Sequence, residues 1–155
     1  MEINAIIKKA NPASAEAKQM AGALWQEIQD RYGFIAPNPF DPTLFSTERA
    51  GFWIAFGADE RPIGSIAVAP VNANEAEIDI MYVSPYYRGG GIAQELMNTL
   101  VKHSKEKDFH VLKLRAGAPQ PEALRFYKKE GFIQIPAFGK WVDDSTAICF
   151  EKQLV

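Results

Sequence analysis

The apolar and polar residues of this chain follow two different periods, and the changes of period divide the sequence into helices and strands. Apolar residues recur every three to four positions over residues 15–31 and again over residues 91–107, as in helices that bury one face. Shorter apolar runs, bounded by glycine, proline, asparagine or aspartate, indicate buried strands. These predicted strands cover residues 2–9, 51–56, 63–71, 75–83, 108–115, 132–135 and 146–154.

The order of these elements predicts how the strands pair. Residues 51–83 contain three strands joined by short turns, which is typical of an antiparallel meander. The helix over residues 91–107 connects two strands, and a connection of that length implies that these strands are parallel. A short helix begins near Pro121 and ends at Gly131, where a left-handed cap is expected. At 155 residues the chain fits one domain, residues 1–155.

Residues 34–47 interrupt this pattern. They contain three prolines, which preclude a long regular helix, and the aromatic residues Phe34, Phe40 and Phe45. Two compatible interpretations follow. The segment forms the wall of a substrate pocket, or it is a loop that packs its aromatic side chains on the core.

Composition and charge mainly exclude classes of protein. A net charge of −2 argues against nucleic acid as the main partner, because duplex binding needs a clustered basic surface. The single cysteine excludes a disulfide framework and a cysteine-based zinc site, and two histidines are few for a metal site, so no metal is expected. No apolar run approaches the roughly 20 residues that span a bilayer, and residues 1–10 lack the core of a signal peptide. We therefore expect a cytoplasmic protein with no membrane partner.

The candidate chemistry is concentrated at residues 83–93, where a strand leads through Arg88 and three glycines into a helix. The first turn of a helix presents unpaired backbone N–H groups and a partial positive charge, and glycines let a ligand approach them. The pattern predicts an anion site. A P-loop is excluded because Ile92 and Ala93 stand where lysine and a hydroxyl residue are needed, and Gln94 replaces the third glycine of a dinucleotide fingerprint.

The pattern Arg88-x-x-Gly91-x-Ala93 resembles the loop Gln/Arg-x-x-Gly-x-Gly/Ala of the GCN5-related N-acetyltransferase superfamily. Residues 123–132 are similar to a second motif of that family, Asn-x-x-Ala-x-x-Phe-Tyr-x-x-x-Gly-Phe, with Gln120 in place of the asparagine. The order of the elements is also that of the family. The resemblance implies a mixed α/β fold with a mostly antiparallel sheet of six to seven strands, one parallel pair at its centre, and flanking helices.

The resemblance also implies a function, namely acetyl transfer from acetyl-CoA, as co-substrate, to a primary amine of a small molecule by direct attack in a ternary complex. In the family, backbone N–H groups of the glycine loop bind the pyrophosphate, and the pantetheine arm follows the preceding strand. Carried over to this sequence, the expected donor-binding residues are Met81, Tyr82, Val83, Arg88, Gly89, Gly90, Gly91, Ile92, Ala93, Gln120 and Phe126.

Acetyl transfer requires a neutral amine, although the pKa of an alkylamine is about 10. Glu77 is the expected catalytic base, acting through a bound water, and Asp79 is either the base or a binding group for the charge of the substrate. In a regular strand these two acids share one face with Met81 and Val83. Tyr127 matches the family's tyrosine and is expected to protonate the leaving thiolate. The alternative is that Tyr127 only packs in the core.

The acceptor site is expected to include Phe34, Phe40, Asp79 and Trp141, while Trp25 is expected to pack on the core. An alternative acceptor is a protein N-terminus or lysine. Two other classes of function stay open, namely a regulatory module that binds acyl-CoA without turnover and a structural or oligomerisation domain with a vestigial site. A homodimer through the C-terminal strands is possible by family resemblance.

Overall fold

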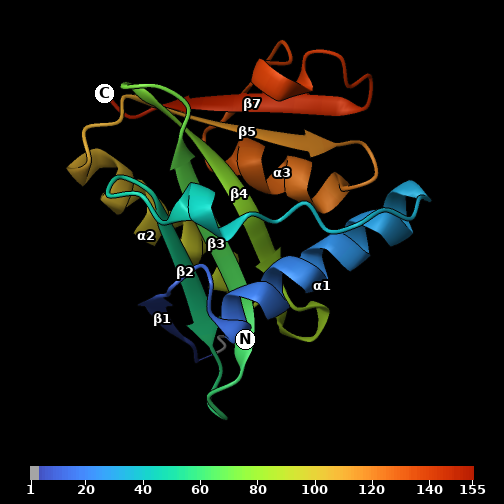
Figure 1. Cartoon of the computed structure of the whole chain (residues 1–155), viewed down its shortest axis with the longest axis vertical. Coiled ribbons are helices and arrows are strands. Elements are labelled where there is room, and N and C mark those ends of the chain that lie inside the picture. The colour runs from blue at the N-terminus through green and yellow to red at the C-terminus, as the bar shows by residue number, and fades with distance from the viewer. Residues whose placement is uncertain (1–3) are drawn as a thin grey trace.

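The computed structural model describes residues 4–155, which form a seven-stranded sheet with helices on both faces (Figure 1). The strands stand in the order β1-β2-β3-β4-β5-β7-β6, and every neighbouring pair is antiparallel except the central pair β4–β5. The predicted fold class is therefore confirmed. The strands are β1 (Ile6–Lys9), β2 (Gly51–Phe56), β3 (Pro62–Pro70), β4 (Glu75–Val83), β5 (Val111–Gly117), β6 (Ile133–Ile135) and β7 (Ala147–Gln153).

Three α-helices cover the sheet. The helix α1 (Ala15–Tyr32) begins after Ser14, whose hydroxyl accepts a hydrogen bond from the first turn, and it ends at Gly33 with a φ of 76°. The other two are α2 (Ile92–Glu106) and α3 (Pro121–Lys129). Short 3₁₀ helices lie in the connections at Pro42–Phe45 (η1), Pro85–Tyr87 (η2) and Gly139–Trp141 (η3).

The two faces of the sheet carry separate hydrophobic clusters. Alternate residues of β2 show this, since Phe52 and Ile54 pack with Ala17 of α1, whereas Trp53 packs with Leu96 of α2. Residues of α3 join the cluster on the α2 side. The helix α1 thus covers one face, and α2 and α3 cover the other (Figure 1).

The fifth strand begins later than the sequence predicts, at Val111 instead of residue 108. Asp108 has a φ of 63°, and the His110 N–H donates to the Asn74 carbonyl oxygen at 2.7 Å, so these residues form the turn after α2. The first strand starts at Ile6, and the part of its prediction that covers residues 2–3 lies outside the described residues.

A β-bulge in β4 changes which side chains share a face. Asp79 pairs with Ala67 and Tyr82 pairs with Ser65, so two residues of β4 oppose one residue of β3. One of the two, Ile80, has a φ of 52°. The strand is therefore not regular, and the shared face expected of a regular strand does not extend past the bulge. Glu77 and Asp79 lie on the α1 face, whereas the side chains of Met81 and Val83 join the core under α2.

The parallel pair β4–β5 is short. Its register covers only Glu75–Glu77 against Val111–Lys113, and beyond these residues the two strands diverge. Within residues 4–155, the edge of β4 after Glu77 therefore has no strand partner on the β5 side. Among the described helices, none is long and apolar enough to cross a membrane.

Candidate active site

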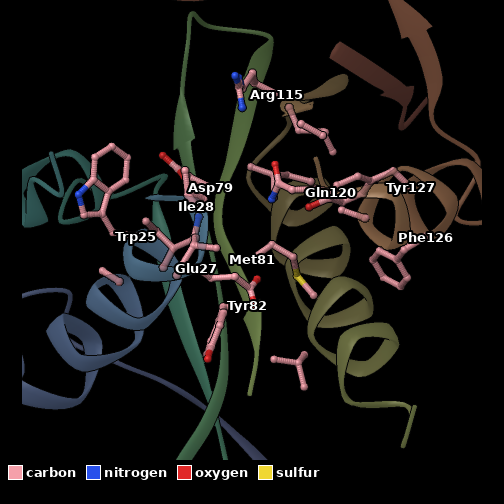
Figure 2. A pocket seen from close by; sticks show the side chains of 18 of the residues that line it. Trp25, Glu27, Ile28, Asp79, Met81, Tyr82, Arg115, Gln120, Phe126 and Tyr127 are labelled. Atoms are coloured by element: carbon pink, nitrogen blue, oxygen red, sulfur yellow. The ribbon is translucent and has the colours of Figure 1, made fainter. Parts of the chain in front are cut away.

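A cavity of about 1010 Å³ fills the opening between β4 and β5 and continues over the α1 face of the sheet. It is lined by α1, the 34–45 segment, β4, the glycine loop, β5, α3 and the η3 loop. Every site residue predicted from the sequence lines this cavity except Gly90. Figure 2 shows how residues from α1, β4 and α3 converge on it.

The glycine loop lines one end of the cavity. Gly89 and Gly91 have φ values of 86° and 88°, a region that favours glycine, and Gly91 is the N-cap of α2. No side chain caps this helix, so the backbone N–H groups of its first turn remain available for a ligand. The geometry fits an anion at the start of α2, as the sequence predicts.

The side chain of Arg88 turns back toward the protein. Its Nε donates to the Val83 carbonyl oxygen at 2.8 Å, and its Nη2 donates to Glu27 Oε1 on α1 at 2.6 Å. Glu27 also lies 3.9 Å from Arg31, which pairs with Glu122 at the start of α3. This chain of charges joins α1 to both the glycine loop and α3. Neither Glu27 nor Arg31 was singled out by the sequence, because a charged residue on a helix surface carries no distinguishing signal.

On the α3 side of the opening, Tyr127 is buried and packs against Phe132 and Phe150. Its side chain projects from α3 toward β4 (Figure 2). Burial, together with the negative charge of Asp79, raises the pKa of Tyr127. The phenol therefore keeps its proton at neutral pH. The Asp79 carboxylate across the opening is near enough for its charge to affect the phenol.

Two carboxylates lie on the α1 side of the opening. Burial raises the pKa of Glu77, while the Trp141 indole N–H, which donates to Glu77 Oε2 at 2.9 Å, acts in the opposite direction. Burial also raises the pKa of Asp79, and its Oδ1 accepts from the Ile80 N–H at 2.8 Å. The two acids are two residues apart on one strand, so both face the same part of the cavity.

Arg115 of β5 organises this side of the cavity. Its Nη1 donates to the Tyr32 hydroxyl at 2.9 Å, and its Nη2 donates to Asp144 Oδ2 at 2.9 Å and to Thr146 Oγ1 at 2.8 Å. The guanidinium also lies 5.4 Å from the centre of the Trp141 ring. Arg115 was not among the residues predicted from the sequence. An arginine within an otherwise apolar strand could have indicated it, because such a side chain needs polar partners.

The remaining predicted residues divide between two roles. Gln120 accepts a hydrogen bond from the Tyr32 hydroxyl at 2.9 Å, which links the start of α3 to α1. Phe40 lines the cavity and stacks on the buried Phe45, so the proline-rich segment packs on the core and also lines the cavity; its role as a substrate wall stays a prediction. The expectation for Trp25 is wrong, because Trp25 lines the cavity instead of packing in the core. Among residues 4–155, no group of three or more potential ligands could hold a metal ion.

A central strand pair that opens beside a glycine-initiated helix is the arrangement expected of N-acyltransferases that take their acyl group from coenzyme A. Residues 18–132 match the sequence model described as the acetyltransferase (GNAT) family. The chain therefore belongs to the GNAT acetyltransferase family, and the resemblance inferred from its motifs is confirmed.

Curated relatives support this membership at low identity. An uncharacterized N-acetyltransferase of Methanocaldococcus jannaschii is 27% identical over 105 residues, which are 64% of this chain and 46% of the relative. An IAA acetyltransferase of Azospirillum brasilense is 29% identical over 91 residues, which are 59% of each protein. The chain spans about half the length of these relatives.

Solved structures share the fold along nearly the whole chain. An acyl-CoA N-acyltransferase structure from Klebsiella pneumoniae has a TM-score of 0.80 at 23% identity and covers 97% of this chain and 98% of its own. A GNAT-family acetyltransferase from Staphylococcus aureus Mu50 has a TM-score of 0.81 at 17% identity and covers 98% of this chain and 100% of its own. At these identities the likeness establishes the fold alone.

Proposed function

We propose that this protein is an N-acetyltransferase that moves the acetyl group of acetyl-CoA to a primary amine of a small molecule within a ternary complex. One observation carries the proposal. The opening between β4 and β5 has two carboxylates, Glu77 and Asp79, on its α1 side and the phenol of Tyr127 on its α3 side. An amine that enters from the α1 side meets the carboxylates that can take its proton. A thiol that leaves toward α3 meets the phenol that can protonate it.

The donor side is built from the glycine loop and the free edge of β4. The N–H groups of the first turn of α2 bind the pyrophosphate, and the pantetheine arm follows β4 beyond Glu77, where no strand competes for its backbone. Gln120 and Phe126 complete the wall on the α3 side.

On the acceptor side, Asp79 holds the incoming ammonium and Glu77 removes its proton through a water molecule. The neutral nitrogen attacks the thioester carbonyl carbon, and backbone N–H groups near Tyr82 stabilise the oxyanion. The carbon–sulfur bond then breaks, the thiolate takes a proton from Tyr127, and the Tyr127 phenolate recovers a proton as the nitrogen loses its second one. The products are the N-acetylated amine and coenzyme A.

Two further functions remain as alternatives. A regulatory module would bind acyl-CoA without turnover, and a protein acetyltransferase would accept an N-terminus or a lysine. The 34–45 segment covers part of the cavity, since Phe34, Asn38 and Leu44 all line the cavity. This cover favours a small acceptor over an extended polypeptide. Paired acidic and phenolic groups at the opening favour catalysis over simple binding.

Release of the coenzyme A thiol from acetyl-CoA in the presence of small amines tests this function. We expect turnover, and we expect Tyr127→Phe to lower kcat about 100-fold while calorimetry shows unchanged acetyl-CoA affinity. Tyr86→Phe is the matched control, because Tyr86 is 89% exposed and does not line the cavity. Acetyl-CoA binding without thiol release from any amine or lysine peptide would instead support the regulatory alternative.

A further inference from the structure

The acceptor side of the cavity has an apolar wall that the transfer chemistry itself does not require. One part of the wall comes from α1 and the other from the segment that follows it. Trp25 and Ile28 project from α1 beside Asp79 (Figure 2). The cavity-lining apolar residues of the two parts include Leu24, Trp25, Ile28, Phe34, Phe40 and Leu44.

Polar contacts at Ala36 fix this wall in place. The Trp25 indole N–H donates to the Ala36 carbonyl oxygen at 2.9 Å, and the Ala36 N–H donates to Gln29 Oε1 at 2.8 Å. The Phe34 ring then packs edge-on against Trp25, with centroids 5.5 Å apart. The indole N–H already donates a hydrogen bond within the protein, so the wall can contact a ligand only through its aromatic surface. That surface is preorganised before a ligand binds.

The inner end of the same region carries two carboxyl groups. Of the lining residues on the α1 face between residues 4 and 155, Glu77 and Asp79 have no cationic partner within salt-bridge distance. The cations on this face are Arg88, which is paired with Glu27, Arg115, which is paired with Asp144, and the exposed Lys140, whose charge acts on both acids without an ion pair. An ammonium at this end is therefore attracted, and a carboxylate attached close to it is repelled.

We propose that the acceptor is an arylalkylamine, that is, a primary amine whose substituent is an uncharged aromatic group, bound with its nitrogen at Glu77 and Asp79 and its ring against Trp25 and Phe34. This inference rests on the proposed function and names the substrate class of the same site. The wall binds the ring, and the two acids reject amino acids, which carry a carboxylate beside the amine.

Kinetics with matched amines test the proposal on the full chain with saturating acetyl-CoA. The panel contains 2-phenylethylamine, ethylamine, phenylalanine, spermidine and a lysine peptide. We expect kcat/KM for 2-phenylethylamine to exceed that for each of the others by about tenfold or more, since the ring adds buried apolar area and phenylalanine adds a repelled charge. A higher value for any other member of the panel would overturn the proposal while leaving the acetyltransferase function intact.

Substitutions at the adjacent residues 34 and 35 test whether the preference for an aromatic amine depends on the apolar wall. Phe34→Ala is expected to reduce the ratio of kcat/KM between 2-phenylethylamine and ethylamine about tenfold, because it removes one side of the aromatic surface. Ile35→Ala is the control, since Ile35 is 98% exposed and does not line the cavity. An unchanged ratio in Phe34→Ala would place the ring elsewhere and would contradict the proposed site.

Calorimetric titration of 2-phenylethylamine into the complex of the protein with coenzyme A distinguishes the proposed acceptor class from the proposed transferase function. Binding that Phe34→Ala weakens, without thiol release in the kinetic assay, would support the acceptor site and refute the transferase function. The absence of binding together with the absence of turnover would refute both.

Discussion

At the scale of single residues, the active site depends on opposing effects on two buried carboxylates. Burial disfavours the ionised form of Glu77, and the hydrogen bond from the Trp141 indole partly restores it. A base must be ionised to accept a proton, so the catalytic rate is expected to fall as the pH drops through the pKa of Glu77. If Glu77 is the base, as proposed, Trp141 is a positioning residue that contacts it through one hydrogen bond.

Trp141→Phe tests this role. The variant removes the hydrogen bond that lowers the pKa of Glu77, so the acidic limb of the pH profile of kcat/KM moves to higher pH. Asp79→Asn moves the limb in the opposite direction, because the charge of Asp79 raises the pKa of Glu77. Limbs that coincide with that of the wild-type protein in both variants would show that Glu77 is not the base.

At the scale of elements, the glycine loop and α1 act together on the donor site. The three glycines are not equivalent, since Gly89 and Gly91 have positive φ values and Gly90 does not. A side chain at a left-handed position costs roughly 1–2 kcal/mol.

Gly91→Ala is therefore expected to lower the free energy of unfolding by about 1 kcal/mol and to weaken acetyl-CoA binding, because it strains the N-cap of α2. Gly90→Ala is the control for stability and is expected to leave the melting temperature near that of the wild-type protein. Thermal unfolding measures both effects. Equal stability losses in the two variants would show that strain at Gly91 is not their cause.

The ion pair between Glu27 and Arg88 places a negative charge beside the predicted pyrophosphate site. Glu27→Gln is expected to strengthen coenzyme A binding about threefold at low salt, with the gain disappearing in high salt as the charges are screened. Glu16→Gln, at the exposed start of the same helix, is the control for net charge. Weaker binding in Glu27→Gln, measured by calorimetry, would mean that the carboxylate serves mainly to order Arg88.

The elements themselves were largely predictable from the sequence, because period and capping are local properties. Ser14 and Gly33 mark the ends of α1, and the glycines before Ile92 mark the start of α2. The bulge in β4 was not predictable from the periodicity of the strand. It depends on the pairing of Ser65 and Ala67 in another strand and places an isoleucine at a positive φ, which no local pattern suggests.

The site was predictable only where it depends on a motif. Gly89, Gly91 and Tyr127 lie within motifs and line the cavity, while the roles expected of them stay predictions. Arg115 and Trp25 were missed or misplaced, because their partners, the Asp144 carboxylate and the Ala36 carbonyl, come from loops whose course the sequence does not determine.

At the scale of the whole molecule, the candidate active site contains a carboxyl group, Asp79, whose ionisation lowers the stability of the fold. The pKa of Asp79 is raised in the folded state, so ionisation of this carboxyl costs stability. The folded state binds the proton more tightly than the unfolded chain does, and stability therefore falls as the pH rises through the folded pKa. Below the unfolded pKa both states are protonated and the cost disappears.

Asp79→Asn is accordingly expected to raise the melting temperature at pH 7.5 by about 2–4 °C and to have little effect near pH 3. Asp143→Asn, at an exposed position in the loop before β7, is the control and is expected to be neutral at both values of pH. Calorimetric scans provide the measurement. A variant that is less stable than the wild-type protein at pH 7.5 would show that the carboxylate has a favourable partner in the folded state.

The short register between β4 and β5 has a consequence for local unfolding. Three residues of each strand pair here, whereas β5 and β7 pair along seven. We therefore expect the segment from β5 to β7, together with α3, to open as one cooperative unit ahead of the meander, so that its amide protons exchange with solvent at a common, faster rate. If acetyl-CoA binds between the two units as proposed, it should slow exchange in both of them.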